Sequence, residues 1–145
     1  MIAPLVDQLA ALNPDIIIHS DMARTRIIAE PLAQRLGLAC IAEPLWRERN
    51  FGEWEGQTWD AIYRATGDAM DGMTNDPEHF QPEGGETTYA MSKRTQQALQ
   101  NLPDVDNIVI VSHGGPIACV RAVRTGTPLQ QIASLIPPTG SVTTL

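Results

Sequence analysis

The chain has 145 residues, of which 43% are hydrophobic and 19% charged, and its formal net charge is −7 at pH 7. This composition is typical of a globular protein, so we expect a single domain over residues 1–145 and exclude an intrinsically disordered chain. The acidic balance argues against a nucleic-acid partner or an anionic membrane surface, and every apolar run is far shorter than the ~20 residues of a membrane helix. A small anionic substrate stays possible, because a pocket needs only local positive charge.

The N-terminal residues and the cysteines indicate a cytoplasmic protein. No basic segment followed by an apolar stretch begins the chain, so we expect no secretion signal. Cys40 and Cys119 are too few for a disulfide framework and lack the spacing of a metal site. We therefore expect free thiols in a reducing cytoplasm, whereas the sequence leaves the oligomeric state open.

The first third of the chain alternates between helical and strand patterns. A one-sided apolar pattern predicts a helix over 2–12, and the run Ile16–Ile18 predicts a buried strand. Ser20 or Asp21 is expected to cap a second helix that closes at Gly37. Pro31 lies inside that helix and removes a hydrogen bond, which predicts a kink or a break near Ala29. Residues 38–42 are predicted to form a short strand.

The middle of the chain is predicted to consist mostly of loops. Residues 43–56 have no clean period, and their Trp, Arg, Glu and Gly content is typical of a site built on a loop. Thr58 is expected to cap a short helix through Tyr63. Residues 67–85 are acidic and rich in Gly and Pro, which indicates a solvated loop. A helix is predicted over 86–101.

The last third contains the pattern that most favours a functional site. Ile108–Val111 is a continuous β-branched run, as in a strand buried on both faces. Ser112-His113-Gly114-Gly115 follows it, and a helix is predicted from there to about Arg124. We further expect Thr127 to cap a short helix that starts at Thr127-Pro128 and runs to Leu135, and we expect a strand to begin over 141–145. Alternating helices and strands predict an α/β fold.

Three polar stretches are candidates for chemistry, each with a plain structural alternative. Arg24 and Arg26 follow the Ser20 strand end and could hold a phosphate beside a helix N-terminus, or form a solvated helix face. Glu48, flanked by arginines, could act as a general acid or take part in a surface ion pair. His113 lies where α/β proteins place reactive groups, or is a core histidine.

Four motifs in order resemble one family. They are Ser20-x-x-x-Arg24, Glu48-Arg-Asn-Phe-Gly-x-Trp-Glu-Gly56, Gly84-Gly-Glu-Thr87 and Val111-Ser-His-Gly-Gly115. Together they resemble the histidine phosphatase (phosphoglycerate mutase-like) superfamily, and most of all its small bacterial α-ribazole phosphatase-type members. The resemblance covers roughly residues 5–144 and implies a three-layer α/β/α sandwich.

The resemblance also implies residue roles and a substrate class. Arg24, with Ser20 and Gly114 beside it, matches the phosphate-binding positions, and His113 matches a histidine that hydrogen-bonds the transferring phosphoryl group. Glu48 matches the carboxylate that protonates the leaving oxygen, and Glu86 matches a position near the pocket rim. The implied partner is a small phosphorylated substrate, and such chemistry needs no metal or other cofactor.

One motif of the family is missing from the 145 residues. The family nucleophile is a histidine in an Arg-His-Gly motif on a central first strand, and no Arg-His-Gly occurs here. His19 follows the wrong strand, and His79 lies in the acidic loop. The chain therefore looks incomplete at both ends. We expect 16–18 and 108–112 either to flank an unfilled slot or to pair with each other.

These features predict a parent activity and two alternatives. The parent activity is phosphate-monoester hydrolysis through a phosphohistidine, with this chain inactive on its own because it lacks the nucleophile. The first alternative is a mutase that moves a phosphoryl group within one sugar acid, although the short 67–85 segment favours a phosphatase. The second is a non-catalytic phosphate-binding protein. The tryptophans Trp46, Trp54 and Trp59 could contact an apolar leaving group or simply pack.

Overall fold

The computed structural model describes residues 2–145 as two compact units. The first unit comprises Met1–Arg47 and Gln97–His113, and the second comprises Glu48–Gln96 and Gly114–Leu145. The expectation of a single domain over 1–145 stays a prediction. None of the helices within residues 2–145 has the length and apolar character needed to cross a bilayer.

The first unit is built on a parallel three-stranded sheet in the order β2-β1-β3. The strands are β1 (Ile16–His19), β2 (Cys40–Ala42) and β3 (Ile108–Val111). Ile17 is fully buried and Ile18 nearly so, as a run without polar alternation predicts. The predicted α/β class is therefore confirmed.

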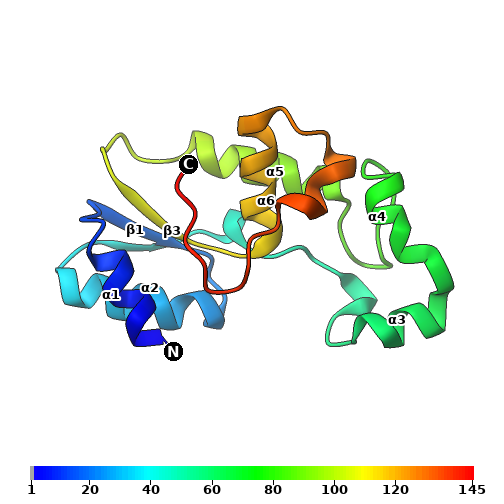
Figure 1. The fold of residues 1–145 in the computed structure, drawn as a ribbon, viewed down its shortest axis with the longest axis horizontal. Helices are drawn as coiled ribbons and strands as arrows, with labels where there is room; N and C mark the ends of the chain where they lie inside the picture. Colours follow the sequence, from blue (N-terminus) through cyan, green and yellow to red (C-terminus); the bar gives the residue numbers. More distant parts are fainter. Residues whose placement is uncertain (1) are drawn as a thin grey trace. The chain divides into compact units, whose positions relative to one another are not determined.

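Strand β1 pairs directly with β3, with Ile16 opposite Ile108 and His19 opposite Val111 (Figure 1). Of the two arrangements expected for these segments, the structure has the paired one. The backbone N–H of Ser20 donates to the carbonyl of Val111 at 3.1 Å, so the pairing continues past the end of β1. Because parallel strands end at the same edge, residues 20 and 113 meet there.

Helices α1 (Ile2–Ala10) and α2 (Ala23–Leu36) accompany this sheet, and α2 contacts all three strands (Figure 1). Val6 and Leu9 of α1 are buried, and Leu32 of α2 is fully so. Gly37 ends α2 with a φ of 64°, a left-handed conformation that a glycine adopts without steric cost. The predicted end of this helix is confirmed.

Two details of α2 differ from expectation. Its N-cap is Met22 rather than Ser20 or Asp21, and no side chain caps it, because the Ser20 hydroxyl is engaged in long-range hydrogen bonds instead. Of the kink or break expected near Ala29, the break is absent, since one helix continues through Pro31. The missing proline N–H would have bonded the carbonyl of Ile27, and Ile27 is half exposed, so water can solvate that carbonyl.

The second unit is mostly helical. It contains α3 (Trp59–Thr66), α4 (Gly72–Asn75), most of α5 (Thr88–Gln100) and α6 (Gly114–Thr125), with the 3₁₀ helices η2 (Gly52–Trp54), η3 (Gly67–Asp71) and η4 (Leu129–Leu135). A further 3₁₀ helix, η1 (Pro44–Trp46), precedes them in the first unit. As predicted, the Thr58 hydroxyl caps α3 by accepting the N–H of Ala61 at 3.1 Å.

Two expectations for the C-terminal residues are wrong. The Thr127 hydroxyl does not cap η4, because it bonds the Thr125 hydroxyl at 2.6 Å and Pro128 occupies the N-cap. Residues 141–145 form no strand, and no backbone segment within residues 2–145 pairs with them in a ladder. An isolated extended segment gains no ladder hydrogen bonds, so its pattern alone does not make it a strand.

Candidate active site

A buried polar cluster lies at the carboxyl edge of the sheet in the first unit. It comprises Ser20, Arg24, Thr25 and His113, and we call it the serine–histidine cluster. Ser20 is 0% exposed, Thr25 2% and His113 7%, whereas the Arg24 side chain reaches solvent. Three of the residues predicted for the site, Ser20, Arg24 and His113, are thus brought together.

The hydrogen bonds of the cluster fix the protonation of His113. Arg24 Nε donates to His113 Nδ1 at 3.0 Å, and an arginine N–H is always a donor, so Nδ1 carries no proton. The proton of the neutral ring is therefore on Nε2, which donates to Ser20 Oγ at 2.7 Å. The structure thus holds His113 as the neutral Nε2–H tautomer.

The hydrogen bonds of Thr25 determine which hydroxyl donates in its contact with Ser20. Its hydroxyl donates to the carbonyls of Ser20 at 2.7 Å and Met22 at 2.8 Å, so its single proton is used there. The Ser20 hydroxyl, which lies 2.8 Å from Thr25 Oγ1, must then be the donor in that contact. All donors consequently point in one direction, from Arg24 through His113 and Ser20 to Thr25. Sequence reasoning missed Thr25, although its place directly after Arg24 one turn into the helix was a usable signal.

Arg24 differs from the other arginines near it. Arg26 pairs with Glu30 at 3.8 Å, and Arg47 pairs with Asp21 through two hydrogen bonds. The Arg47 guanidinium lowers the pKa of the Asp21 carboxyl, mainly through that hydrogen bonding. Within residues 2–145, Arg24 has no carboxylate within 4.0 Å and no hydrogen bond at its Nη atoms. One edge of its guanidinium is held by His113, and the other edge can accept an anion.

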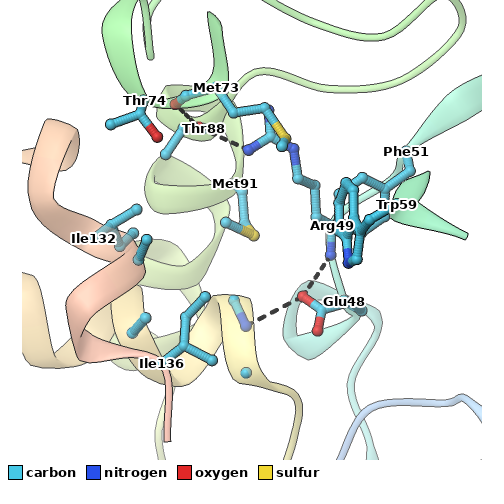
Figure 2. A pocket seen from close by; sticks show the side chains of 14 residues that line it. Glu48, Arg49, Phe51, Trp59, Met73, Thr74, Thr88, Met91, Ile132 and Ile136 are labelled. Atoms are coloured by element: carbon cyan, nitrogen blue, oxygen red, sulfur yellow. Dashed lines mark hydrogen bonds between the residues drawn. The ribbon is translucent and has the colours of Figure 1, made fainter. Parts of the chain in front are cut away.

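The second unit holds Glu48 beside a pocket of about 340 Å³ (Figure 2). Glu48 Oε1 accepts the backbone N–H of Arg49 at 2.9 Å and that of Gly115 at 3.2 Å. Gly115 lies in the first turn of α6, and a Cβ at this position would be 2.4 Å from Glu48 Oε1. Only glycine permits this approach. Oε2 of Glu48 makes no hydrogen bond within residues 2–145, so it can exchange a proton with a ligand.

Gly114, also predicted for the site, lines the same pocket, whereas Glu86 does not. The Glu86 carboxylate pairs with Arg94 at 2.6 and 3.1 Å and accepts the N–H of Asn50 at 2.9 Å. Arg94 also donates to the carbonyl of Glu48 at 3.0 Å. Glu86 and Arg94 therefore hold the segment that carries Glu48, and the predicted role of Glu86 in substrate binding stays a prediction.

Arg49, like Arg94, is a polar residue of this unit to which the sequence assigned no role. Its guanidinium donates to Thr88 Oγ1 at 2.7 Å and to the carbonyl of Glu86 at 3.1 Å. Arg49 is 7% exposed, and its buried Nε has no hydrogen-bond partner among residues 2–145. Burial lowers the pKa of Arg49, an effect that the nearby Glu86 partly offsets. The sequence offered no local signal for these contacts, which join residues about forty positions apart.

Comparison with known proteins identifies the family. The sequence profile of the histidine phosphatase superfamily (branch 1) matches residues 1–145. The probable phosphoglycerate mutases GpmB of Erwinia tasmaniensis and Escherichia fergusonii are each 30% identical over 115 residues, which is 77% of this chain and 54% of theirs. The chain thus spans about half the length of the curated relatives that it matches.

Several solved structures share the fold, and two of those named below are structures of phosphatases. Bacillus stearothermophilus YhfR has a TM-score of 0.81 at 27% identity, over 92% of this chain and 67% of that one. A mycobacterial glucosyl-3-phosphoglycerate phosphatase in complex with VO3 has a TM-score of 0.80 at 25% identity, over 92% and 68%. The α-ribazole phosphatase from Shigella flexneri, at 24% identity and a TM-score of 0.75 over 90% and 68%, is similar in fold. The predicted resemblance and the phosphoglycerate mutase-like α/β fold are confirmed.

Proposed function

The chain belongs to the histidine phosphatase superfamily, and from that premise we propose that its residues serve phosphate-monoester hydrolysis. In this proposal Arg24 and His113 bind the phosphoryl group, with Ser20 orienting the His113 ring. Glu48 protonates the leaving oxygen and then activates water, and Gly114 belongs to the binding surface. The substrate is a small phosphorylated molecule.

The observation that carries the proposal is the state of Arg24. Its Nε holds the histidine ring at 3.0 Å, while its Nη edge lacks an anionic partner within the described residues 2–145. A guanidinium presented in this way can bind two phosphate oxygens in a fork. The N-terminus of α2, which begins at Ala23, adds a favourable partial charge for the same anion.

The proposed chemistry follows from these groups. Phosphoryl transfer depends mainly on positioning and on neutralising charge at the phosphoryl oxygens. Arg24 supplies a fixed charge, His113 supplies a ring whose orientation two hydrogen bonds fix, and Glu48 supplies an oxygen without a partner in residues 2–145. The family reaction also needs a nucleophilic histidine in an Arg-His-Gly motif, which these 145 residues do not contain. We therefore propose that this chain binds phosphate but does not turn over alone.

Phosphate binding can be measured by titrating the 145-residue chain with inorganic phosphate and following the His113 ring signals by NMR. We expect saturable binding that Arg24→Ala weakens at least tenfold, because the guanidinium is lost. Arg26→Ala is the matched control, since Arg26 lies on the same helix and already pairs with Glu30. Equal binding by the Arg24→Ala variant would refute the proposed phosphate site.

Turnover is tested separately with a generic aryl phosphate. We expect no hydrolysis by the 145-residue chain above the rate of the buffer. Hydrolysis that His113→Ala abolishes, with no added segment, would contradict the proposed inactivity while supporting the family chemistry. Binding without turnover would equally suit a non-catalytic phosphate-binding protein, and adding an Arg-His-Gly strand in trans distinguishes the two, because only a latent phosphatase would then hydrolyse the ester.

The mutase alternative is supported by the names of the Erwinia and Escherichia relatives, which are probable phosphoglycerate mutases. It predicts that 3-phosphoglycerate binds more tightly than inorganic phosphate, because a mutase must also hold the carboxylate. Equal affinities would favour hydrolysis. We also propose a cytoplasmic location, which the two free thiols of Cys40 and Cys119 support.

A further inference from the structure

We propose that the pocket of the second unit binds an apolar, ring-containing group, and that this group is the alcohol part of the phosphate ester. The assignment of this group as the alcohol part of the ester rests on the proposed function, in which Glu48 protonates the leaving oxygen. The pocket has a volume of about 340 Å³, enough for a small ring system. Phe51 of its lining belongs to one of the family motifs, whereas the other apolar residues of the lining do not.

The lining is dominated by carbon and sulfur. The apolar side chains that form it come from η2 and α3 with their flanks, from α4, α5, α6 and η4; they are Phe51, Trp59, Met73, Met91, Ala118, Ile132, Ala133 and Ile136. Figure 2 shows Ile132 and Ile136 facing Met91 and the two aromatic rings across the space. Methionines adapt to the shape of a ligand and make favourable contacts with aromatic rings.

Several polar groups of the lining are already engaged in hydrogen bonds, whereas Glu48 Oε2 and the Thr74 hydroxyl make none within residues 2–145. The Thr88 hydroxyl accepts from Arg49 at 2.7 Å and donates to the carbonyl of Met73 at 3.0 Å. Glu48 Oε1 accepts two backbone N–H groups, and both Nη atoms of Arg49 have acceptors. A polyhydroxylated alcohol has more hydroxyls than these two groups can pair, and each hydroxyl left unpaired costs about 1–3 kcal/mol. The pocket therefore favours an apolar alcohol over a sugar.

The three tryptophans, which the sequence could not tell apart, are now distinguished. Trp46 is 2% exposed and Trp54 6%, so both are packing residues, whereas Trp59 is 53% exposed and lines the pocket. The Trp59 ring meets Phe51 edge-on, with the ring centroids 5.6 Å apart. This pair presents an aromatic wall that no other side chain within residues 2–145 covers completely.

Glu48 gives the bound group a direction. It lies at one end of the lining, and Met73, Thr74 and Thr88 lie at the other (Figure 2). A ring that fills the pocket with its oxygen toward Glu48 places that oxygen near Oε2, the carboxylate oxygen without a hydrogen bond in residues 2–145. The pocket and the proposed proton donor thus serve one leaving group.

The test uses 4-ethylphenol as the apolar ring alcohol and glycerol as the polar alcohol. Binding is followed through the indole N–H signals of the three tryptophans, assigned with Trp59→Phe. We expect 4-ethylphenol to shift the Trp59 signal saturably and to leave that of the buried Trp54 unchanged, and we expect no saturable shift with glycerol. A similar response to both alcohols, or none to 4-ethylphenol, would overturn the proposal.

A pair of variants on η4 locates the binding site. Ala133 lines the pocket and is exposed, so Ala133→Phe fills the space without disturbing the core, and we expect at least a tenfold loss of 4-ethylphenol affinity. Gln130→Phe on the same helix lies outside the lining and should bind as the unmodified chain does. Equal affinity of both variants would show that the alcohol binds elsewhere and would refute the site.

The outcome is independent of the phosphate experiment. A neutral alcohol needs neither Arg24 nor His113, so its binding should survive Arg24→Ala. Alcohol binding without phosphate binding would uphold the pocket and reject the proposed function. Phosphate binding without alcohol binding would reject the pocket alone. A 4-ethylphenol affinity that Arg24→Ala lowers as much as Ala133→Phe does would contradict the placement of the ligand in the second unit.

Discussion

The serine–histidine cluster and the pocket beside Glu48 are built on opposite principles. In the cluster, Ser20, Thr25 and His113 are almost completely buried and satisfy one another in a single chain of hydrogen bonds. In the pocket, the polar atoms are mostly satisfied by backbone groups or neighbours, and about 340 Å³ of space is left unfilled between apolar side chains. The cluster is thus specified by polar geometry and the pocket by shape, and the two should respond differently to substitution.

The largest effect is expected at His113. His113→Ala removes the donor to Ser20 and the acceptor of Arg24, so it should lower the free energy of unfolding by about 2–3 kcal/mol. Glu48→Gln keeps an oxygen that accepts the same two backbone N–H groups and should cost clearly less. Chemical denaturation measures both. His79→Ala is the control, because the exposed His79 side chain pairs with Asp76 and lies outside the cluster. A larger loss of stability for Glu48→Gln than for His113→Ala would contradict this order of effects.

An intermediate effect is expected at Arg94. Arg94→Met keeps the aliphatic stem but removes the hydrogen bonds to Glu86 and to the Glu48 carbonyl, and should cost about 1–2 kcal/mol. Because these bonds hold the segment at 48–50, amide exchange at Arg49 and Asn50 should also accelerate. Lys93→Met, on an exposed neighbour in the same helix, should change neither quantity. Unchanged exchange in Arg94→Met would mean that the segment is held without this ion pair.

A smaller effect is expected from Cys119, which lies on α6 next to Ala118 of the pocket lining. Burial raises the pKa of its thiol from 9.0 to about 12. The folded state therefore keeps a proton that the unfolded state loses above the unfolded pKa, so stability falls with rising pH between these values. At pH 10 this amounts to about 1 kcal/mol. Cys119→Val should remove that part of the loss of folding stability at alkaline pH, which chemical denaturation at pH 7 and pH 10 measures.

Cys40 provides the comparison for this prediction, because it is only partly buried. A thiol reagent at pH 8 should label Cys40 and spare Cys119 until the protein unfolds. Rapid labelling of Cys119 in the native protein would show that the interior beneath the pocket opens readily. The loss of folding stability at alkaline pH would then have an origin other than the buried Cys119 thiol.

The smallest effect is expected at the exposed pair of Asp21 and Arg47. The hydrogen bond from Arg47 lowers the pKa of Asp21, so the pair contributes stability above the unfolded carboxyl pKa of 3.8 and loses it as the pH falls through the lower folded value. Because the pair is solvated, Asp21→Asn should change stability at pH 7 only slightly. A large change would mean that this loop supports the neighbouring cluster.

Local patterns predicted the strands and the motif residues well. The runs at Ile16–Ile18 and Ile108–Val111 lack polar alternation, and both became neighbouring strands of one sheet. Burial was predicted well for the first run only, because Val109 is the one buried residue of β3. The motifs also brought Ser20, Arg24 and His113 to one cluster. The strands and the motifs can be predicted because they are encoded by residues that are close together in the sequence.

The predictions that failed depended on distant partners. Ser20 has the side chain of a helix cap, but its hydroxyl bonds a histidine 93 positions away. Residues 141–145 have a strand-like pattern, yet a strand exists only where a ladder partner lies beside it. The same reason hid Arg94, whose partners Glu86 and Glu48 are defined by the fold rather than by spacing. The pocket lining was hidden too, because it is assembled from six segments.

The direction of the hydrogen bonds in the serine–histidine cluster limits proton transfer through it. The chain runs from a guanidinium, which does not lose its proton, to the backbone carbonyls of Ser20 and Met22, which do not take one up. This chain of hydrogen bonds therefore cannot relay a proton. His113 can donate a hydrogen bond to a ligand only by giving up its bond to Ser20, and a proton delivered to a departing group has to come from a carboxyl such as Glu48 or from water.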